Sequence, residues 1–342
     1  MKRNPFKLVF IFISLLVLLA GCGSESSGSK PEEEKQNSQA STEESETKVV
    51  RIGYQKGNTL NILKAKGNLE ERFKEKGIKV EWSPFPTGSV LLEALNAGSI
   101  DFGHASDGNS VFAQASGKPI VYIASESPYP KGVAIVVKKD SPIQSIRDLK
   151  GKKVAVTKGG NQQYLLVKAL EKEGLKYEDV TPVYYKDAAE GRVAFESGKI
   201  DALGIWDPFL AVIENDLDVR EITNGEGLTE NRTYYFASEK FSKEKPDLIK
   251  IILEELEKSN QWANENPNEV AKILSDELKI DEKAIEIATK RREYGILKID
   301  EQAIKSQQEL ADTFFELGLM PNDVNVEESI EKDPDWLPDI IK

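Results

Sequence analysis

The sequence predicts an α/β protein, and three observations lead to that class. Short apolar runs alternate with amphipathic segments from Val49 onward, which is typical of strands and helices that follow one another in a layered domain. After about residue 240 the apolar runs give way to helical patterns. In addition, residues 87–107 share a pattern with residues 187–207. The sequence therefore predicts two α/β lobes and a helical C-terminal segment.

The segment before this body has the features of an export signal. A basic start is followed by an apolar run from Leu8 to Ala20 and by the chain's one cysteine, Cys22. The run is short for a transmembrane helix and ends in small residues, as cleaved signals do. The residues Leu19-Ala20-Gly21-Cys22 at its end resemble the bacterial lipobox, whose cysteine is lipidated. The alternative is an ordinary export signal in which the cysteine occurs by chance. We expect residues 1–21 to be cleaved and Cys22 to be lipidated. The protein would then be anchored to the cell membrane outside the cytoplasm, on the outer face of a Gram-positive cell.

Composition limits the chemistry of the rest of the chain. Residues 22–48 are almost wholly small, polar or charged, so we expect a disordered linker. About 290 residues remain, enough for one large or two medium domains. The net charge of −12 disfavours nucleic acid as a partner. The chain has one cysteine and one histidine, His104, so it cannot form an intramolecular disulfide or a His-based metal cluster. A Ser-His-Asp triad would have to use His104, because no second histidine is present. We expect no metal and no cofactor.

The elements follow in order from the period of the apolar residues. The expected strands are 49–54, 78–82, 100–104, 120–124, 133–137, 153–157, 181–185, 202–205 and 233–237. Helical patterns lie between them, for example over Asn161–Glu173. Four later helices are expected around 247–264, 268–278, 283–292 and 301–317, most of them opened by Pro or Asp at cap-like positions.

The internal repeat consists of a helix end, a glycine and a strand. Gly98 precedes Ile100-Asp101 in the first copy, and Gly198 precedes Ile200-Asp201 in the second. Glycine suits the left-handed residue that ends a helix. Any two helix-glycine-strand units look alike, which is the alternative explanation, but the match continues to Asp107 and Asp207.

Two lobes require the chain to cross between them. We expect lobe I to contain residues 49–138 and 236–342, and lobe II residues 139–235. The crossings are expected near Lys138–Pro142 and Arg232–Ala237, with the helical tail packing on the first lobe.

The predicted loops at the carboxyl ends of the strands contain the candidate binding residues, because open α/β sheets bind ligands there. Helix N-termini in these loops supply N–H groups and the positive end of the helix dipole, which suit an anion. The candidate residues are Gln55, Gly57, Asn58, Thr87, Gly88, Ser89, Asp107, Gly160, Asn161, Gln162, Asp187 and Trp206.

Several of these residues have a structural alternative. Ser89 and Asn161 suit N-caps, and Trp206 either covers an alkyl group of a ligand or belongs to the core. Asp207 before Pro208 has the pattern of an N-cap. Asp187 facing an ammonium group would favour a taurine-like ligand.

Longer strings resemble a known family. They are Leu92 to Gly103, Phe112 to Gly117, Ile205-Trp206-Asp207-Pro208-Phe209, Asn231 to Tyr235 and Arg291 to Gly295. In order and spacing they are similar to the aliphatic sulfonate-binding proteins of ABC importers, within the wider nitrate, sulfonate and taurine group. The family often has Gly-Ser-Ser at Gly160-Asn161-Gln162 and Pro-Ala-Asp near Lys186-Asp187-Ala188, so this chain departs from it at two loops.

The resemblance implies a type II periplasmic-binding-protein-like fold, with two lobes joined by a two-strand hinge. It implies a monomer that closes on a small organic anion, an aliphatic sulfonate first of all, and delivers it to an ABC permease. Taurine, nitrate and a thiamine-precursor pyrimidine remain alternative ligands. A pyrimidine-forming enzyme on the same fold and a non-transport adhesin or sensor lipoprotein are the other classes. We expect no enzyme, because His104 alone offers reactive side-chain chemistry at the strand ends.

Overall fold

A computed structural model describes residues 48–341. These residues lie within one compact unit, Glu46–Lys342. The predictions for the export signal, for Cys22 and for the linker up to residue 47 fall outside the described residues. Within the described range, none of the helices has the length and apolar character needed to cross a membrane.

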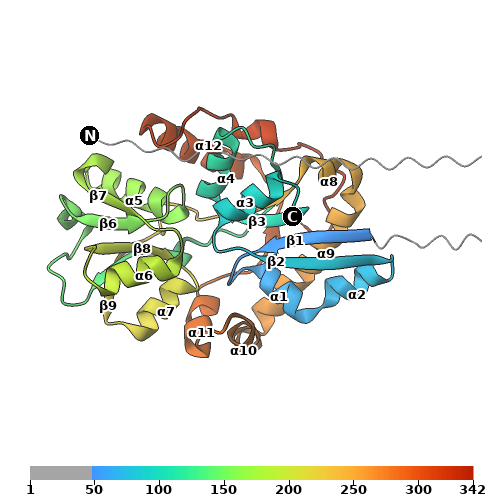
Figure 1. The fold of residues 1–342 in the computed structure, drawn as a ribbon, viewed down its shortest axis with the longest axis horizontal. Helices are drawn as coiled ribbons and strands as arrows, with labels where there is room; N and C mark the ends of the chain where they lie inside the picture. Colours follow the sequence, from blue (N-terminus) through green and yellow to red (C-terminus); the bar gives the residue numbers. More distant parts are fainter. Residues whose placement is uncertain (1–47, 342) are drawn as a thin grey trace, which may run out of the picture. The chain divides into compact units, whose positions relative to one another are not determined.

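The first sheet has the strand order β11-β4-β10-β3-β1-β2. Figure 1 labels β1, β2 and β3 of this sheet. Its central part is parallel, since β1 pairs in parallel with β2 and β3. β10 runs antiparallel between β3 and β4. Its strands are β1 (Lys48–Tyr54), β2 (Ile78–Pro84), β3 (Phe102–Ser106), β4 (Val121–Glu126), β10 (Thr233–Ala237) and β11 (Ile296–Leu297). The strand β11 contradicts the prediction that strands stop after residue 240.

The second sheet repeats this arrangement with the order β7-β6-β8-β5-β9. β6 pairs in parallel with β7 and β8, and β5 runs antiparallel between β8 and β9. Its strands are β5 (Val133–Lys138), β6 (Lys153–Val156), β7 (Thr181–Tyr184), β8 (Ala202–Trp206) and β9 (Val219–Asn224). The sequence prediction missed β9, whose residues are only partly buried or exposed and form no apolar run.

The chain crosses between the sheets at residues 127–132 and 225–232, and we call these segments the first and second crossing. The predicted crossing at Lys138–Pro142 is wrong, because β5 pairs with β8 and β9 in the second sheet. An apolar run such as 133–137 predicts a buried strand but not the sheet to which it belongs. The second crossing ends where β10 begins, within the predicted range Arg232–Ala237.

Helices cover both faces of each sheet. On the first sheet, α1 (Thr59–Lys66), α2 (Asn68–Lys74) and α9 (Pro246–Glu265) pack on one face, and α3 (Gly88–Asn96) and α4 (Asp107–Ala115) on the other. On the second sheet, α5 (Asn161–Lys172) packs on one face, and α6 (Ala188–Glu196) and α7 (Phe209–Asp216) on the other. The remaining helices are α8 (Glu239–Glu244), α10 (Pro267–Leu278), α11 (Glu282–Lys290) and α12 (Glu301–Glu316).

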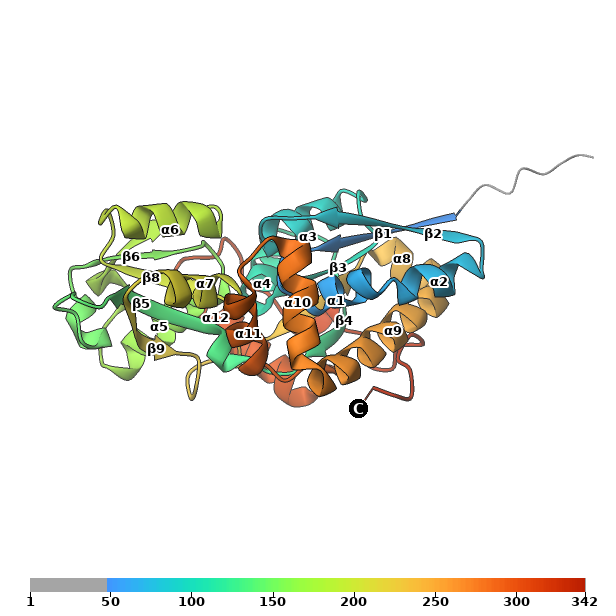
Figure 2. The same ribbon diagram turned by 90° about the horizontal axis from the view of Figure 1, so that it is seen from below.

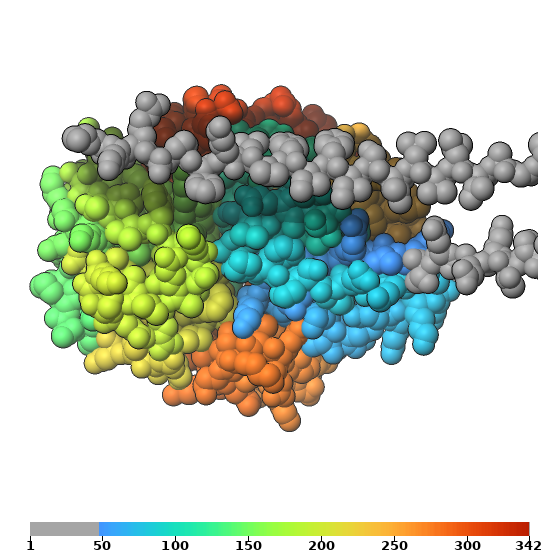
Figure 3. All heavy atoms as spheres, in the orientation of Figure 1, coloured from blue at the N-terminus to red at the C-terminus, as the bar shows by residue number. Residues whose placement is uncertain are grey.

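The helical tail contacts both sheets rather than the first alone. α9 and α10 pack on α1, as predicted for the tail, whereas α11 packs against α7 of the second sheet through alanine residues (Figure 2). Leu310 and Phe314 of α12 belong to an apolar cluster that also contains Val133 of β5 and Leu165 of α5. In the space-filling view the parts of the chain that form the two sheets touch one another (Figure 3).

The structure confirms the internal repeat residue by residue. α3 and β3 span Gly88–Asn96 and Phe102–Ser106, and α6 and β8 span Ala188–Glu196 and Ala202–Trp206. Gly98 and Gly198 have φ angles of 71° and 70°, in the left-handed region that glycine adopts without steric cost.

Candidate functional site

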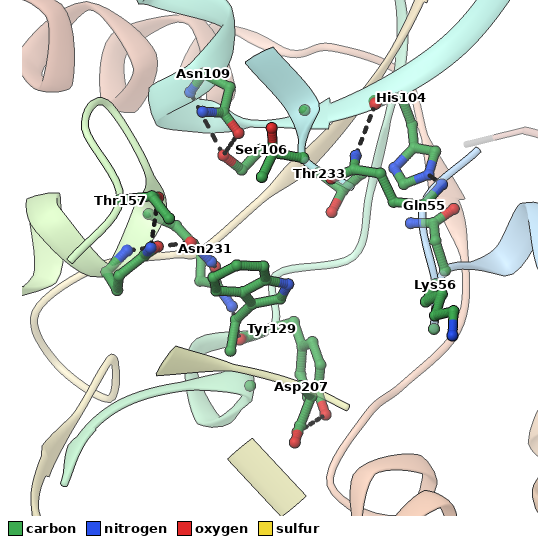
Figure 4. A pocket seen from close by; sticks show the side chains of 18 of the residues that line it. Gln55, Lys56, His104, Ser106, Asn109, Tyr129, Thr157, Asp207, Asn231 and Thr233 are labelled. Atoms are coloured by element: carbon green, nitrogen blue, oxygen red, sulfur yellow. Dashed lines mark hydrogen bonds between the residues drawn. The ribbon is translucent and has the colours of Figure 1, made fainter. Parts of the chain in front are cut away.

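A cavity of about 90 Å³ lies at the carboxyl ends of the parallel strands. Loops after β1, β2, β3, β6 and β8 contribute to its wall, together with the two crossings. The lining residues are Gln55, Lys56, Gly57, Asn58, Thr87, Gly88, His104, Ser106, Asn109, Tyr129, Gly132, Thr157, Asn161, Gln162, Trp206, Asp207, Asn231, Thr233 and Arg292. Figure 4 shows side chains from both sheets around this space.

Two of the helices that begin at the cavity have no side-chain cap. Thr87 precedes α3 and Gly160 precedes α5, and neither residue accepts a side-chain hydrogen bond from the helix that follows it. The first N–H groups of a helix have no partner within the helix, and the positive end of the helix dipole lies there. One of these helix ends comes from each sheet. The cavity therefore offers backbone donors from two sides, which is a suitable environment for an anion.

The neighbouring helices satisfy their first N–H groups with their own side chains. Asn58 Oδ1 accepts from the Leu60 N–H at 3.2 Å. Ser106 Oγ accepts from the Asn109 N–H at 3.4 Å, and Asp187 Oδ1 accepts from the Glu190 N–H at 2.9 Å. At α5 the side chain of Asn161 also takes part, since its Oδ1 accepts from the Gln162 N–H at 3.1 Å, so α3 has the larger set of free donors.

Asn109 connects the N-terminus of α3 to the second sheet. Its Nδ2 donates to Ser89 Oγ at 2.9 Å and to the carbonyl oxygen of Gly159 at 3.3 Å. A Cβ atom at Gly88 would lie 2.6 Å from Asn109 Oδ1, so this packing requires glycine. The hydroxyl of Ser89 is thus engaged by Asn109.

A buried ion pair forms one wall of the cavity. Arg292 Nη2 donates to Glu126 Oε2. Glu126 also accepts from Asn58 Nδ2 at 2.9 Å and from the Tyr235 hydroxyl at 2.6 Å. Burial opposes the charge on each partner, but their attraction outweighs it, so the pKa of Glu126 falls and the pKa of Arg292 rises. The charge of Arg292 is therefore balanced within the protein.

Asp207 is the acidic residue of the lining, and it too has partners. Its Oδ2 accepts from the Tyr129 hydroxyl at 2.5 Å and lies 3.6 Å from Arg291 Nε. Burial raises the pKa of Asp207 to about 6, against the lowering effects of Arg291 and Tyr129. The Tyr129 ring also faces the Arg292 guanidinium, with 5.1 Å between the guanidinium carbon and the ring centroid.

His104 is held as a neutral hydrogen-bond acceptor. Its Nε2 accepts from the Gln55 backbone N–H at 3.0 Å, and Gln55 Nε2 donates to the His104 carbonyl oxygen at 3.1 Å. Burial lowers the pKa of His104 to about 4. Because a backbone donor occupies Nε2, that nitrogen is not free to act as a general base.

Trp206 gives the cavity an apolar surface. It is partly buried, and its ring stacks on that of Tyr185 with 6.4 Å between centroids and 5° between planes. The ring of Phe209 packs edge-on against that of Trp206, with 5.7 Å between the ring centroids. Trp206 therefore combines a packed position with a surface on the cavity.

The cavity brings together most of the predicted residues: Gln55, Gly57, Asn58, Thr87, Gly88, Asn161, Gln162 and Trp206 line it. Ser89, Asp107, Gly160 and Asp187 are not among the lining residues. Ser89 is bonded to Asn109, and Gly160 is the N-cap of α5. Asp107 binds the backbone N–H groups of Gly108 and Arg232, and Asp187 caps α6. Asp187 therefore offers no support for an ammonium-bearing ligand.

Sequence reasoning missed the lining residues that come from the crossings and from the tail, notably Tyr129, Asn231 and Arg292. They lie far along the chain from the strand-end loops, and no local pattern marks them. Asn231 and Arg292 did occur in strings that carried the family resemblance, which was the available signal. Among residues 48–341, no group of three or more His, Cys, Asp or Glu side chains is arranged to hold a metal ion.

Comparisons with known proteins agree on one family. The NMT1/THI5-like family matches residues 70–270. A protein of Escherichia coli (strain K12) called a putative aliphatic sulfonates-binding protein is 34% identical over 297 residues, covering 86% of this chain and 91% of that protein. A protein of the same description from Bacillus subtilis (strain 168) is 32% identical over 333 residues, covering 95% and 94%.

Solved structures give the same result. The alkanesulfonate-binding protein SsuA from Xanthomonas axonopodis pv. citri, bound to MOPS, has a TM-score of 0.78 and 34% identity, covering 83% of this chain and 98% of that one. The desulfurization enzyme DSZB, with a TM-score of 0.61 and 14% identity, shares the fold alone. The relatives similar in sequence are thus described as binding proteins, and the enzyme is a distant neighbour.

Proposed function

We propose a function for this chain on the basis of its family: it belongs to the NMT1/THI5-like family and is homologous to the aliphatic sulfonate-binding proteins. The chain is the extracytoplasmic solute-binding component of an ABC importer. It binds a small aliphatic sulfonate between two lobes, each formed by one sheet and its helices, and delivers it to a membrane permease. Cys22 carries the lipid that holds the protein at the membrane.

The observation that carries this proposal is that two helix N-termini, those of α3 and α5, lie at one cavity and receive no side-chain cap from their N-cap residues, Thr87 and Gly160. A sulfonate has three acceptor oxygens and is charged at all accessible pH values, so it requires several donors and cannot be neutralised by a proton. Backbone N–H groups from both helices meet this requirement without adding a net charge to the protein.

The balance of charges in the wall supports a single anionic group. Arg292 is paired with Glu126, and Asp207 with Arg291 and Tyr129. Lys56 Nζ donates to the carbonyl oxygen of Leu278 at 3.0 Å. With these charged groups already engaged, the helix dipoles at α3 and α5 provide the main attraction for an anion.

The size of the cavity supports a short alkyl chain. At about 10–15 Å³ for each water-sized group, 90 Å³ holds roughly six to nine such groups. A sulfonate with a short alkyl tail is of this size, and Trp206 provides an apolar surface for the tail.

The same site gives little support to the enzyme alternative. Catalysis at His104 would require a free ring nitrogen, and Nε2 of His104 already accepts a hydrogen bond from Gln55. Binding at this site instead gains contacts from both lobes, so a ligand shifts the protein toward a closed state.

Thermal unfolding of the purified protein with a panel of ligands tests the proposal. Ethanesulfonate is expected to stabilise the protein, by about 2.7 kcal/mol at one hundred times its Kd. Sulfate serves as the control, because it offers the anion without the alkyl tail. A stabilisation seen only with nitrate, taurine or a hydroxymethylpyrimidine would contradict the ligand assignment and retain a binding protein.

A further inference from the structure

The two crossings run side by side and are hydrogen bonded to each other. The Tyr129 N–H donates to the carbonyl oxygen of Glu230 at 3.0 Å, and the Gly225 N–H donates to that of Pro130 at 3.0 Å. These two segments are where the chain changes from one sheet to the other, so a movement of one sheet relative to the other changes their backbone conformation. A residue that joins both crossings to the cavity is therefore well placed to link ligand binding to such a movement.

Asn231, in the second crossing, makes these connections with one side chain. Its Nδ2 donates to the carbonyl oxygen of Tyr129 in the first crossing at 2.5 Å. Its Oδ1 accepts from Nδ2 of Asn161, the first residue of α5, at 2.5 Å. Asn231 is 7% exposed and lines the cavity, where Figure 4 shows it between Thr157 and Tyr129.

The backbone of Asn231 is also specialised. Its φ angle of 50° lies in the left-handed region, which asparagine adopts more readily than most residues with a side chain. Arg232, the next residue, is held by Asp107 through both of its backbone polar groups. Asp107 Oδ2 accepts from the Arg232 N–H at 3.2 Å, and the Asp107 N–H donates to the Arg232 carbonyl oxygen at 2.9 Å. The left-handed turn places the amide of Asn231 between the crossings and α5.

We propose that Asn231 is a positioning residue that couples an anion at the N-terminus of α5 to the geometry of the two crossings. The proposal rests on the proposed function, since it assumes that a sulfonate engages the first turn of α5. An anion bound there restricts the position of Asn161, the first residue of α5. Asn161 is hydrogen bonded to the Asn231 side chain, and Asn231 in turn is hydrogen bonded to the carbonyl oxygen of Tyr129 in the first crossing. Loss of the Asn231 amide breaks this chain of hydrogen bonds, in which its Oδ1 and its Nδ2 each have a partner in the protein.

Asn231→Gly tests the side chain alone, because glycine keeps the left-handed backbone. Lys279→Gly is the matched control: Lys279 also has a positive φ, 56°, but ends α10 and is not among the lining residues. For ethanesulfonate we expect Asn231→Gly to raise the Kd about tenfold, the effect of losing one or two neutral hydrogen bonds. The compaction on ligand addition, measured by small-angle X-ray scattering, is expected to shrink. Lys279→Gly is expected to change neither.

A double-mutant cycle separates coupling from a general loss of structure. If Asn231 acts through Asn161, the double variant Asn161→Ala/Asn231→Gly has nearly the same Kd as the more affected single variant. Fully additive losses would overturn the proposal, as would wild-type affinity and compaction in Asn231→Gly.

Hydrogen exchange distinguishes failure of this proposal from failure of the proposed function. Without ligand, Asn231→Gly is expected to accelerate amide exchange in residues 127–132, because Tyr129 loses its side-chain partner. If the wild type binds no sulfonate, the proposed function fails. Faster exchange in the variant would then still support the role of Asn231 in holding the crossings, and unchanged exchange would overturn it.

Discussion

Residues 87–107 and 187–207 form the same helix and strand, but their helices begin in different ways. Thr87 leaves the first N–H groups of α3 without a side-chain cap and lines the cavity. Asp187, at the matching position, caps α6 with its carboxylate and is not a lining residue. One copy therefore leaves the first N–H groups of its helix without a side-chain cap at the cavity, and the other satisfies them internally. A repeated fold thus does not imply a repeated binding site.

The strand ends of the two copies, in contrast to their helix starts, use their aspartates alike. The Asp107 N–H donates to Arg232 of the second crossing, and the Asp207 N–H donates to Gly132 of the first, both at 2.9 Å. The residue after each aspartate, Gly108 or Pro208, lies close to a glycine in a loop of the other sheet. A Cβ at Gly108 would lie 2.5 Å from the Gly159 carbonyl oxygen, and one at Gly57 would lie 2.4 Å from Pro208. The copies share their cross-contacts and differ in what they offer a ligand.

The largest expected effect concerns His104, whose place in the second copy is taken by Gly204. The folded pKa of about 4 lies below the ordinary 6.5, so the unfolded state binds more protons between these values. Stability from neutral His104 is present above pH 6.5 and is lost as the pH falls toward 4, by about 3 kcal/mol.

Chemical denaturation of the wild type and of His104→Gln at pH 7 and pH 4 measures this effect. Using the difference between the two proteins removes the contributions of Asp107 and Asp207, which also titrate with shifted pKa values. A difference that does not change with pH would contradict the buried, neutral state of His104.

Thr87→Asp makes the first copy resemble the second. A carboxylate at this position caps α3 and repels an anion, so the affinity for ethanesulfonate is expected to fall at least about 100-fold. Calorimetric titration measures the loss, with Thr87→Ser as the control that keeps a hydroxyl and adds no charge. Unchanged affinity in the aspartate variant would place the sulfonate away from α3.

Gly57→Ala tests the contact between the β1 loop and Pro208. The added methyl group meets Pro208, so closure is impeded and the affinity is expected to fall about tenfold. Gly67→Ala is the matched control, because Gly67 also has a positive φ, 69°, but has no atom within 4 Å of an added Cβ. Both variants should lose stability, and only Gly57→Ala should lose affinity. Equal affinities would show that this contact is irrelevant to binding.

The smallest effect is expected from Asp187→Ala in the second copy. Loss of this cap is expected to cost about 1 kcal/mol of unfolding free energy, while the Kd for ethanesulfonate stays within about twofold. Thermal unfolding and titration on the same sample measure both quantities. A large loss of affinity would show that the two helix starts are more alike in function than their hydrogen bonds indicate.

The repeat also shows what the sequence alone predicts. The periods of apolar residues gave most strands and the late helices, and Gly98 and Gly198 marked the helix ends, because these features depend on local geometry and burial. The pattern of 133–137 could not indicate its sheet, since a buried strand has the same pattern beside any partner. Asp187 was proposed for the site because its loop follows a predicted strand, and the choice between capping and an open N-terminus is not visible in the spacing.

The first sheet is discontinuous in the chain, and this has a consequence for the order of folding. β10 lies between β3 and β4, so these two strands have no link in the sheet until residues 233–237 are available. All five strands of the second sheet come from the continuous stretch 133–224. When the chain becomes available from its N-terminus onward, the second sheet has all its strands before the first sheet does. The facing edges of β3 and β4 therefore stay unpaired until β10 arrives, and during this interval they are exposed to aggregation and proteolysis.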